Sequence, residues 1–548
     1  MNPMTFISDY LEMLKLENLY EYLAYKSNQH ADCFAAQEYR DGRIFTHTYT
    51  ELLNDVRTFG NYLIENDIYR KHISIIGGFS YEWLVSLFSV LYSNNVVVPI
   101  DGGQSSERIS VLLRAAEAEV IITRNKSLSL EQGIAPNVKS IIYFEDLNRI
   151  IASGAPGNVQ KAFNAPAPES PAMIVFTSGT AGASKGVLLS HKNILHAVIG
   201  SVTCLGENAF SPGDTTIELL PLFHLYGITA GIFDVFYYGI SLCYSKNTIK
   251  DIEILMKTFK PSVLIAVPQI VEGLHKKIWA MAKKAGKQDI LKIALRFNSV
   301  LRKVNIDLRK ILFNNILKSF GGNLTAIICG GAAVSEKVVK EMDEFGIDVL
   351  VGYGLTECSP IVSINPPKKK KLGSVGVPLP EPLCSVKIKD GEIMVSGSIV
   401  MDGYYKDPEG TSDAFDEGKW LKTGDTGRFD ADGYLYITGR KKDLIILSDG
   451  NNISPEELET RIRQSPVVDS VMVYAEKRKQ TPVLCALIYP DFQYCAAENI
   501  SDINGETAKL IRRINNENPG YMKIFDFKIS ELPFEETAVG KIKRGNII

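Results

Sequence analysis

Several features that mark other protein classes are missing from this 548-residue chain. No apolar run is long enough to cross a bilayer, and the N-terminal stretch carries Asp9 and Glu12 with no basic region before an apolar one. We therefore expect neither a membrane span nor a secretory signal. The eight cysteines form no C-x-x-C pair, which argues against a zinc site and a disulfide framework. We expect mostly buried thiols in a reducing, cytoplasmic compartment.

A strong charge imbalance is also missing. The chain has 60 Lys+Arg against 63 Asp+Glu, so its electrostatics give no general case for nucleic-acid binding and favour small-molecule chemistry. Its length exceeds that of one hydrophobic core, which predicts two or more domains. We find no internal repeat and no extended low-complexity tract.

Helices alternate with short apolar strands through most of the first 350 residues. Helices are expected at 81–92, 105–118 and 251–259, with another beginning near Ser335. This alternation predicts a mostly parallel sheet that is covered on both faces, with ligands beyond the carboxyl ends of its strands. The loops after Phe176 and Val351 occupy such positions, so we expect them to converge on one crevice. The strands are expected at 73–76, 96–100, 120–123, 172–176, 263–267, 324–329 and 348–351.

The pattern changes after Gly373. Strands at 386–389 and 392–395, and at 427–430 and 434–438, flank Asp-Gly turns, which predicts antiparallel hairpins. Further on we expect a helix at 454–464 with Ser454 as N-cap, strands at 470–474 and 483–488, and a helix around 507–516. The predicted fold class is α/β: a large domain (1–441) of mostly parallel, doubly wound sheets with a small antiparallel, barrel-like part, then a small α+β domain (442–548).

One loop carries a phosphate-binding pattern. Residues 175–186 read VFTSGTAGASKG and directly follow a predicted buried strand. Backbone N–H groups, hydroxyls and an ammonium can surround an anion in such a loop. It is not the common P-loop, because Lys185 lies between Ser184 and Gly186 and lacks the following hydroxyl that would bind magnesium. The alternative is an ordinary flexible loop.

Further motifs follow in a fixed order. They are Gly352-Tyr-Gly-Leu-Thr-Glu357, Gly373-Ser-Val-Gly-Val-Pro378, Thr423-Gly-Asp425, Gly439-Arg-Lys-Lys-Asp443, Asp449-Gly-Asn-Asn-Ile-Ser-Pro-Glu456 and Gly540-Lys-Ile-Lys-Arg544. In this order, over roughly residues 30 to 548, they resemble the adenylate-forming superfamily of acyl-CoA synthetases, adenylation domains and beetle luciferase. The resemblance is greatest to the long-chain fatty acyl-CoA synthetases. It implies an enzyme that joins a carboxylic acid to AMP and passes the acyl group to a thiol, using ATP, Mg²⁺ and coenzyme A.

The resemblance also assigns residue roles. Tyr353 would stack on adenine, Asp425 would accept the ribose hydroxyls with Arg440 beside it, and Glu357 would hold Mg²⁺. His224 and Lys185 join the catalytic set, at the acyl carboxylate and the phosphates respectively. The family pattern usually has Thr at position 181 and Pro at 184, whereas this chain has Ala181 and Ser184, which should weaken the grip on pyrophosphate. The nucleotide-binding residues implied are Thr177, Ser178, Gly179, Thr180, Gly182, Gly331, Tyr353, Gly354, Thr356, Asp425 and Arg440.

The second domain is expected to be mobile. Lys541 resembles the family's catalytic lysine, which bridges the carboxylate and the α-phosphate. Lys442 matches the hinge position. Rotation there would exchange Lys541 for the loop 449–454, which contains Gly450 on the expected path of coenzyme A.

The acid and the acceptor are less defined. Tyr226 stands where amino-acid-activating relatives carry an aspartate, so an amino acid would leave its ammonium unpaired. A basic amphipathic stretch at 283–318, which looks like long-chain acyl-CoA synthetases, fits an anionic membrane or an acidic acyl carrier protein, so a peripheral membrane association stays open. The leading hypothesis is a fatty acyl-CoA ligase. The alternatives are a stand-alone ligase that loads a carrier-protein phosphopantetheine, and a nucleotide-binding regulator with little turnover.

Overall fold

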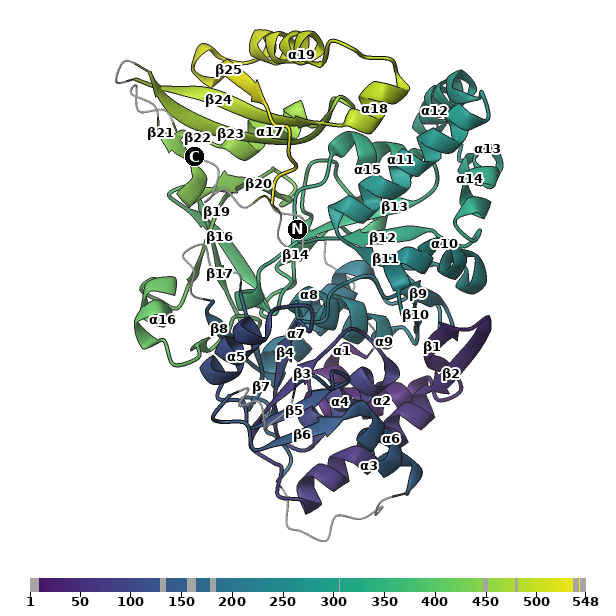
Figure 1. Cartoon of the computed structure of the whole chain (residues 1–548), viewed down its shortest axis with the longest axis vertical. Coiled ribbons are helices and arrows are strands. Elements are labelled where there is room, and N and C mark those ends of the chain that lie inside the picture. The colour runs from purple at the N-terminus through teal and green to yellow at the C-terminus, as the bar shows by residue number, and fades with distance from the viewer. Residues whose placement is uncertain are drawn as a thin grey trace.

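Figure 1 shows the computed structural model of the chain, with the small C-terminal unit at the top and the largest sheet near the bottom. The structure describes residues 9–128, 135–154, 164–177, 184–304, 306–446, 452–478, 481–535 and 542. Within these residues, no helix is long and apolar enough to cross a membrane.

The largest sheet has seven strands in the order β18-β8-β7-β4-β3-β5-β6. The five strands from β7 to β6 are parallel, and β8 and β18 add to them in antiparallel fashion. The central parallel strands β3, β4, β5 and β7 are mostly buried because helices cover them, and every residue of β4 is buried. The strands are β3 (His72–Ile76), β4 (Val96–Ile100), β5 (Val120–Thr123), β6 (Ser140–Tyr143), β7 (Pro171–Phe176), β8 (Gly186–Ser190) and β18 (Gly403–Tyr404).

A second, five-stranded sheet has the order β11-β12-β13-β14-β15, in which the first three strands are parallel. Its strands are β11 (Val263–Ala266), β12 (Ala326–Cys329), β13 (Asp348–Tyr353), β14 (Ser363–Ile364) and β15 (Val377–Pro378). A four-stranded sheet has the order β2-β1-β10-β9. Its strands are β1 (Phe34–Arg40), β2 (Arg43–Thr48), β9 (Thr215–Ile217) and β10 (Ser241–Ser245).

Helices cover these sheets. The longer ones are α2 (Leu19–Gln29), α3 (Tyr49–Glu65), α4 (Tyr81–Tyr92), α5 (Ser106–Ala115), α6 (Phe144–Ala152), α7 (His191–Leu205), α10 (Thr248–Phe259), α11 (Pro268–Lys284), α12 (Gln288–Lys303) and α15 (Glu336–Glu344). Shorter helices are α8 (Leu225–Ile228), α13 (Arg309–Leu312), α14 (Asn314–Ser319) and α16 (Pro408–Ala414). The alternation of strand and helix that the sequence predicts is therefore present, and α4 has the expected bounds.

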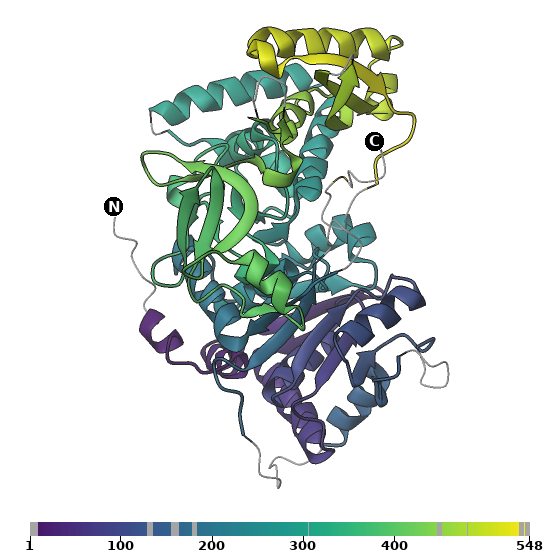
Figure 2. The ribbon, with the colours of Figure 1, turned by 90° about the vertical axis from the view of Figure 1, so that its left-hand side faces the viewer.

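The antiparallel part is a four-stranded sheet of β16 (Ser385–Lys389), β17 (Glu392–Ser396), β19 (Leu421–Phe429) and β20 (Leu435–Arg440). The C-terminal unit contains β21 (Ile445–Ile446), β22 (Asn452–Ile453), β23 (Val468–Arg478), β24 (Thr481–Pro490) and β25 (Ile524–Ile529), with α17 (Pro455–Ile462), α18 (Phe492–Ala497) and α19 (Ile503–Glu517). Figure 2, turned by 90°, shows the four-stranded sheet between this unit and the large sheet. The α/β fold class is confirmed.

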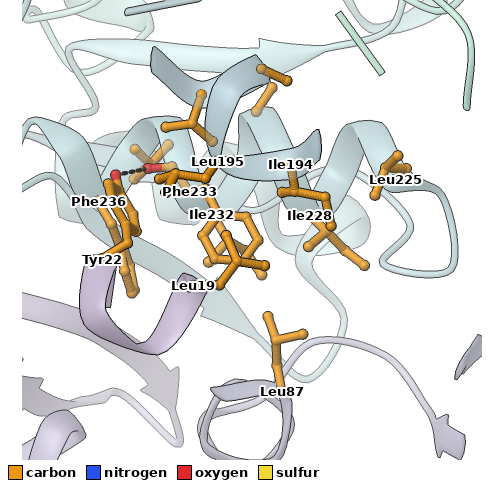
Figure 3. Close-up of a cluster of buried hydrophobic side chains, with 14 of the residues drawn as sticks. Leu19, Tyr22, Leu87, Ile194, Leu195, Leu225, Ile228, Ile232, Phe233 and Phe236 are labelled. Atoms are coloured by element: carbon orange, nitrogen blue, oxygen red, sulfur yellow. Dashed lines mark hydrogen bonds between the residues drawn. The ribbon is translucent and has the colours of Figure 1, made fainter. Parts of the chain in front are cut away.

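The main core lies where α2, α4, α7 and the π-helical turn Thr229–Asp234 meet (Figure 3). Its side chains, which include Leu87, Ile194 and Phe236, are almost fully buried. The Tyr22 hydroxyl in this core donates to the carbonyl of Phe233 at 2.7 Å (Figure 3), so its burial leaves this donor paired.

Some sequence expectations need correction. The sequence predicted a strand that begins at 427, but β19 begins at Leu421, contains Asp425 and extends through a bulge at Thr426 and Gly427. The basic stretch 283–318 is divided among the end of α11 and the separate helices α12, α13 and α14. Ser454 does occupy the N-cap of α17, yet its side chain caps nothing. The expectation of mostly buried thiols is confirmed, since all cysteines except the half-buried Cys33 are buried and every one is free.

Candidate functional site

A buried carboxylate joins the five-stranded sheet to the antiparallel sheet. Asp425, which is about 5% exposed, accepts a hydrogen bond from the Tyr353 hydroxyl at 2.7 Å through Oδ2. Its Oδ1 lies 3.0 Å from Nε of Arg440. Burial and the charge of Asp425 raise the pKa of the Tyr353 hydroxyl, so that group stays a neutral donor. Three residues that the sequence predicted as one nucleotide site are thus in direct contact.

Strand pairing explains this contact. Asp425 of β19 and Arg440 of β20 are direct cross-strand partners, so their side chains can lie on the same face of the hairpin. Tyr353 ends β13 and reaches Asp425 from the neighbouring sheet. The arrangement presents an aromatic ring beside a carboxylate that already holds one cation and one hydroxyl.

The chain after Tyr353 can only follow its path because residue 354 is a glycine. A Cβ on Gly354 would lie 1.6 Å from the carbonyl oxygen of Pro360, well inside van der Waals contact. The backbone then enters the short 3₁₀ turn Thr356–Cys358, which carries Thr356 and Glu357. The glycine therefore allows a tight loop that holds Tyr353 and Glu357 on one wall.

Glu357 is linked through Tyr404 to the phosphate-type loop, by which we mean the predicted phosphate-binding loop within residues 175–186. The Tyr404 hydroxyl donates to Oε1 of Glu357 at 2.9 Å, and Nζ of Lys185 lies 4.5 Å from the centre of the Tyr404 ring. Lys185 also pairs with Asp407 at 3.4 Å, and both side chains are about two-fifths exposed. The loops after β7 and β13 thus meet at Tyr404 of β18, as expected for one crevice.

The base of the phosphate-type loop is closed by its own backbone. The amide of Thr177 donates to the carbonyl of Lys185 at 3.0 Å, which brings the two ends of the loop together. The hydroxyl of Ser184 accepts from the guanidinium of Arg108 at the start of α5. The residue that replaces the usual proline therefore has a structural partner of its own.

His224 precedes α8, and its side chain has an unsatisfied polar atom. Its Nε2 is buried and finds no hydrogen-bond partner among the described residues. Burial lowers its pKa and the charge of Asp101 opposes that shift, so the ring is neutral at pH 7. A neutral imidazole with a free buried nitrogen is a fitting neighbour for a polar substrate group.

A cavity of about 500 Å³ lies at the carboxyl ends of β3, β4 and β5 and is lined in part by Phe223, the residue before His224. It lies where open α/β sheets bind ligands. Added Cβ atoms at Gly77 and Gly78 would meet nothing within 4 Å, so backbone is uncovered there. Its walls include Ile76, Gly77, Gly78, Phe79, Asp101, Gly102, Gly103, Arg124, Asn125, Leu220 and Phe223.

Some of the remaining predicted residues lie in described parts of the chain, and the others lie outside them. Gly331, the second residue after β12, has φ +90°, and Lys442 lies in the 3₁₀ turn Lys441–Asp443. The Tyr226 hydroxyl donates to the carbonyl of Ile328 at 3.1 Å. Ser178, Gly179, Thr180, Gly182, Gly450 and Lys541 lie outside the described residues, so their predicted roles stay predictions.

Sequence reasoning missed Tyr404, Asp407 and Asp101. Tyr404 and Asp407 follow the first hairpin of the antiparallel part, far from any glycine-rich motif. Asp101 directly follows the predicted buried strand 96–100, and its position in front of a Gly-Gly pair was the one signal that could have drawn attention to it.

Comparison with known proteins decides the family. A family model for AMP-binding enzymes matches residues 24–405, and a model for the C-terminal domain of AMP-binding enzymes matches residues 442–548. The chain belongs to the AMP-binding enzymes. Among curated relatives it is 29% identical to Long-chain-fatty-acid--CoA ligase FadD15 of Mycobacterium bovis, over 84% of this chain and 80% of that protein. It is 30% identical to mouse (Mus musculus) Long-chain-fatty-acid--CoA ligase 5, over 81% and 71% of the two chains.

Solved structures confirm the fold of this AMP-binding enzyme. The anthranilate CoA ligase AuaEII in complex with anthranoyl-AMP superposes with a TM-score of 0.75 at 20% identity, covering 96% of each chain. ATP-bound MatB from Rhodopseudomonas palustris gives a TM-score of 0.74 at 21% identity, covering 96% and 97%. At this identity the likeness establishes the shared architecture.

Proposed function

We propose that this AMP-binding enzyme is an ATP-dependent, AMP-forming ligase that activates a fatty acid and transfers the acyl group to coenzyme A. One observation carries the proposal. The Tyr353–Asp425–Arg440 contact and the Lys185–Tyr404–Glu357 contact lie only a few residues apart along the loop that follows β13. The residues proposed for the nucleoside and the residues proposed for the phosphates are thus adjacent. The names of the curated relatives support the fatty acid as substrate.

The residues present fit MgATP. Glu357 offers Mg²⁺ a carboxylate oxygen, and phosphate oxygens and water would complete the coordination shell. Mg²⁺ held there would supply positive charge to offset the charge on the phosphates as pyrophosphate leaves. Lys185 would hold the β- and γ-phosphates after exchanging its exposed, weak pair with Asp407 for the stronger anion. Asp425 would accept the ribose hydroxyls while Tyr353 covers the base.

The carboxylate of the acid would lie near His224, whose free buried nitrogen can donate to it. Tyr226, which is hydrogen-bonded to a backbone carbonyl, offers no carboxylate to a substrate ammonium. An α-amino acid would therefore bury an unpaired cation, which is costly. These contacts favour a simple fatty acid over an amino acid.

The cavity at the carboxyl ends of β3, β4 and β5 is our proposed entry for part of coenzyme A. Uncovered backbone at Gly77 and Gly78 and the guanidinium of Arg124 suit a phosphate group. Asp101, which also lines the cavity, disfavours phosphate binding there because a carboxylate repels phosphate. The thiol would then need a path from this cavity to the acyl group near His224.

We propose that residues 442–548 rotate about Lys442 between the two half-reactions. Surface ion pairs between the parts are consistent with an exchangeable interface, because such pairs contribute little. Lys276 of α11 lies 3.3 Å from Asp491, and Lys283 pairs with Glu498. Lys441 is anchored on Glu392 of β17 at 2.7 Å, which fixes the residue before the hinge.

The direct test is a pyrophosphate-release screen with fatty acids of graded length and with aryl acids and amino acids as controls. The proposal expects release with fatty acids and a thioester when coenzyme A is added. Thioester on an acyl carrier protein but not on coenzyme A would contradict the acceptor. No release with any acid would favour a nucleotide-binding regulator.

Lys541→Ala tests the rotation. Loss of one preorganised charge should lower adenylate formation by on the order of 10²-fold. Thioester formation from presynthesised acyl-adenylate should be far less affected, because that step would use the other orientation. Equal losses in both half-reactions would contradict the proposed exchange.

A further inference from the structure

Helix α12 exposes a continuous apolar stripe. Ile290, Ile293, Phe297, Val300 and Val304 follow one another at spacings of three and four residues, so they share one face of the helix. Each of these side chains is between 53% and 67% exposed. The stripe extends for about 21 Å at the rise of an α-helix. We call these five residues the α12 stripe.

The opposite face of α12 is already packed. Leu291 is buried, and the side chain of Asn298 donates to Oε2 of Glu344 on α15 at 2.5 Å. Arg302 of α12 also pairs with Asp343 of α15 at 2.7 Å. These contacts fix the orientation of α12. The stripe therefore faces away from the core and is left exposed by the rest of the described chain. Exposed apolar rows of this kind mark interaction sites.

Exposed apolar side chains continue beyond α12, before and within α13. Ile306 and Ile311, before and within α13, are 46% and 75% exposed. Figure 1 places α12 and α13 at the outer edge of the molecule, away from the seven-stranded sheet. The surface is therefore open to a large, extended partner.

The stretch that contains the α12 stripe is rich in bases, and three of them, Lys283, Arg302 and Arg309, pair with acids outside it. Residues 283–318 contain ten Lys+Arg against two Asp, within a chain whose net charge is −3. Both acids are neutralised locally, Asp289 by Lys292 at 3.0 Å and Asp307 by Arg309 at 2.9 Å. Among the described residues, several other bases here form no ion pair. They are Lys284, Lys287, Arg296 and Lys310.

We propose that the α12 stripe docks this enzyme on the surface of an anionic lipid bilayer. Ile293, Phe297 and their neighbours would enter the boundary between headgroups and acyl chains, while Lys287 and Arg296 would meet lipid phosphates. An apolar face flanked by bases is the pattern of helices that lie in the interface.

Two other occupants fit less well. A second copy would bring two positive surfaces together in a symmetric contact, which like charges oppose. A protein partner is usually met by Tyr, Trp and hydrogen-bonding groups, whereas the α12 stripe consists of aliphatic side chains and one Phe.

Sedimentation of the full-length chain with vesicles tests the proposal. Binding is expected to vesicles of phosphatidylcholine with a quarter phosphatidylglycerol, to weaken with salt, and to be much weaker with phosphatidylcholine alone. Ile293→Gln with Phe297→Gln should lower binding at least about tenfold. Lys287→Glu with Arg296→Glu should remove the preference for anionic lipid. The matched control is Ile44→Gln with Val111→Gln, which changes exposed apolar residues elsewhere and should bind as wild type.

A second readout reports insertion directly. The added tryptophan of Phe297→Trp should shift its emission to the blue on anionic vesicles, and that of Val111→Trp should not. Wild-type chain that stays in the supernatant, or an Ile293→Gln/Phe297→Gln variant that binds as wild type, would overturn the proposal. So would light scattering that finds a dimer which this variant dissociates while vesicles have no effect. None of these readouts requires ligase activity, so they stand or fall separately from the proposed reaction.

Discussion

Replacing Asp425 by asparagine tests the nucleotide site most sharply. The carboxylate is about 5% exposed and holds Tyr353 at 2.7 Å and Arg440 at 3.0 Å. Hydrogen bonds to a charged group contribute about 1.5–3 kcal/mol each. Loss of the charge that would receive two ribose hydroxyls should therefore lower kcat/KM for ATP by about 10²-fold.

Matched variants separate this effect from a general loss of structure. Tyr353→Phe keeps the ring and removes one donor to Asp425, so it should lower kcat/KM for ATP by only about fivefold. Asp430→Asn makes the same change just beyond the end of β19, where the carboxylate pairs with Lys371 at 2.7 Å, and should leave ATP kinetics within about twofold.

The assay combines steady-state rates over ATP and acid concentration with thermal unfolding of each variant. The Asp425→Asn loss should appear with ATP as the varied substrate and should persist at temperatures where the variant is fully folded. An Asp425→Asn enzyme within threefold of wild type for ATP would refute the reasoning, as would an equal loss in Asp430→Asn.

Three further outcomes follow. Glu357→Gln should raise the Mg²⁺ concentration for half-maximal rate by about tenfold or more, measured by titration at saturating ATP; an unchanged titration would exclude Glu357 as a ligand. Gly354→Ala should cost about 2 kcal/mol or more of unfolding free energy by denaturant titration, while Gly352→Ala, whose Cβ would lie 3.2 Å from a carbonyl, should cost clearly less. Burial lowers the pKa of His191 to about 3, so below pH 6.5 the unfolded chain binds a proton at this residue and the folded chain does not. The free energy of unfolding therefore decreases as the pH is lowered, by about 2 kcal/mol from this group at pH 5. His191→Asn should flatten that fall, and an unchanged slope would count against this origin.

The sequence was informative where one segment determines the geometry. The spacing of Tyr353 and Glu357 within one loop, and the buried strands before Lys185 and Gly352, could be predicted because hydrophobic period and glycine placement are local properties. The predicted strand 427–430 left Asp425 outside it, because the glycine of Thr-Gly-Asp interrupts the local strand pattern, whereas tertiary pairing with β20 extends β19 through a bulge to include Asp425.

Contacts between distant segments could not be predicted. Tyr404 lies between Lys185 and Glu357 because β18 adds to the edge of the seven-stranded sheet beside β8. No local pattern specifies that pairing. For the α12 stripe, the sequence alone shows the basic and apolar residues. Which of their side chains face outward could not be predicted, because it depends on the packing of α12 against α15.

The central claim is that an organic acid attacks the α-phosphorus of ATP, and isotope transfer tests it most directly. A fatty acid labelled with ¹⁸O in its carboxylate is turned over with ATP, Mg²⁺ and coenzyme A, and the products are analysed by mass spectrometry. The account predicts one ¹⁸O in AMP for each thioester formed, because the bridging oxygen of the acyl-adenylate leaves with AMP. Label in inorganic phosphate or pyrophosphate, or thioester without labelled AMP, would contradict it.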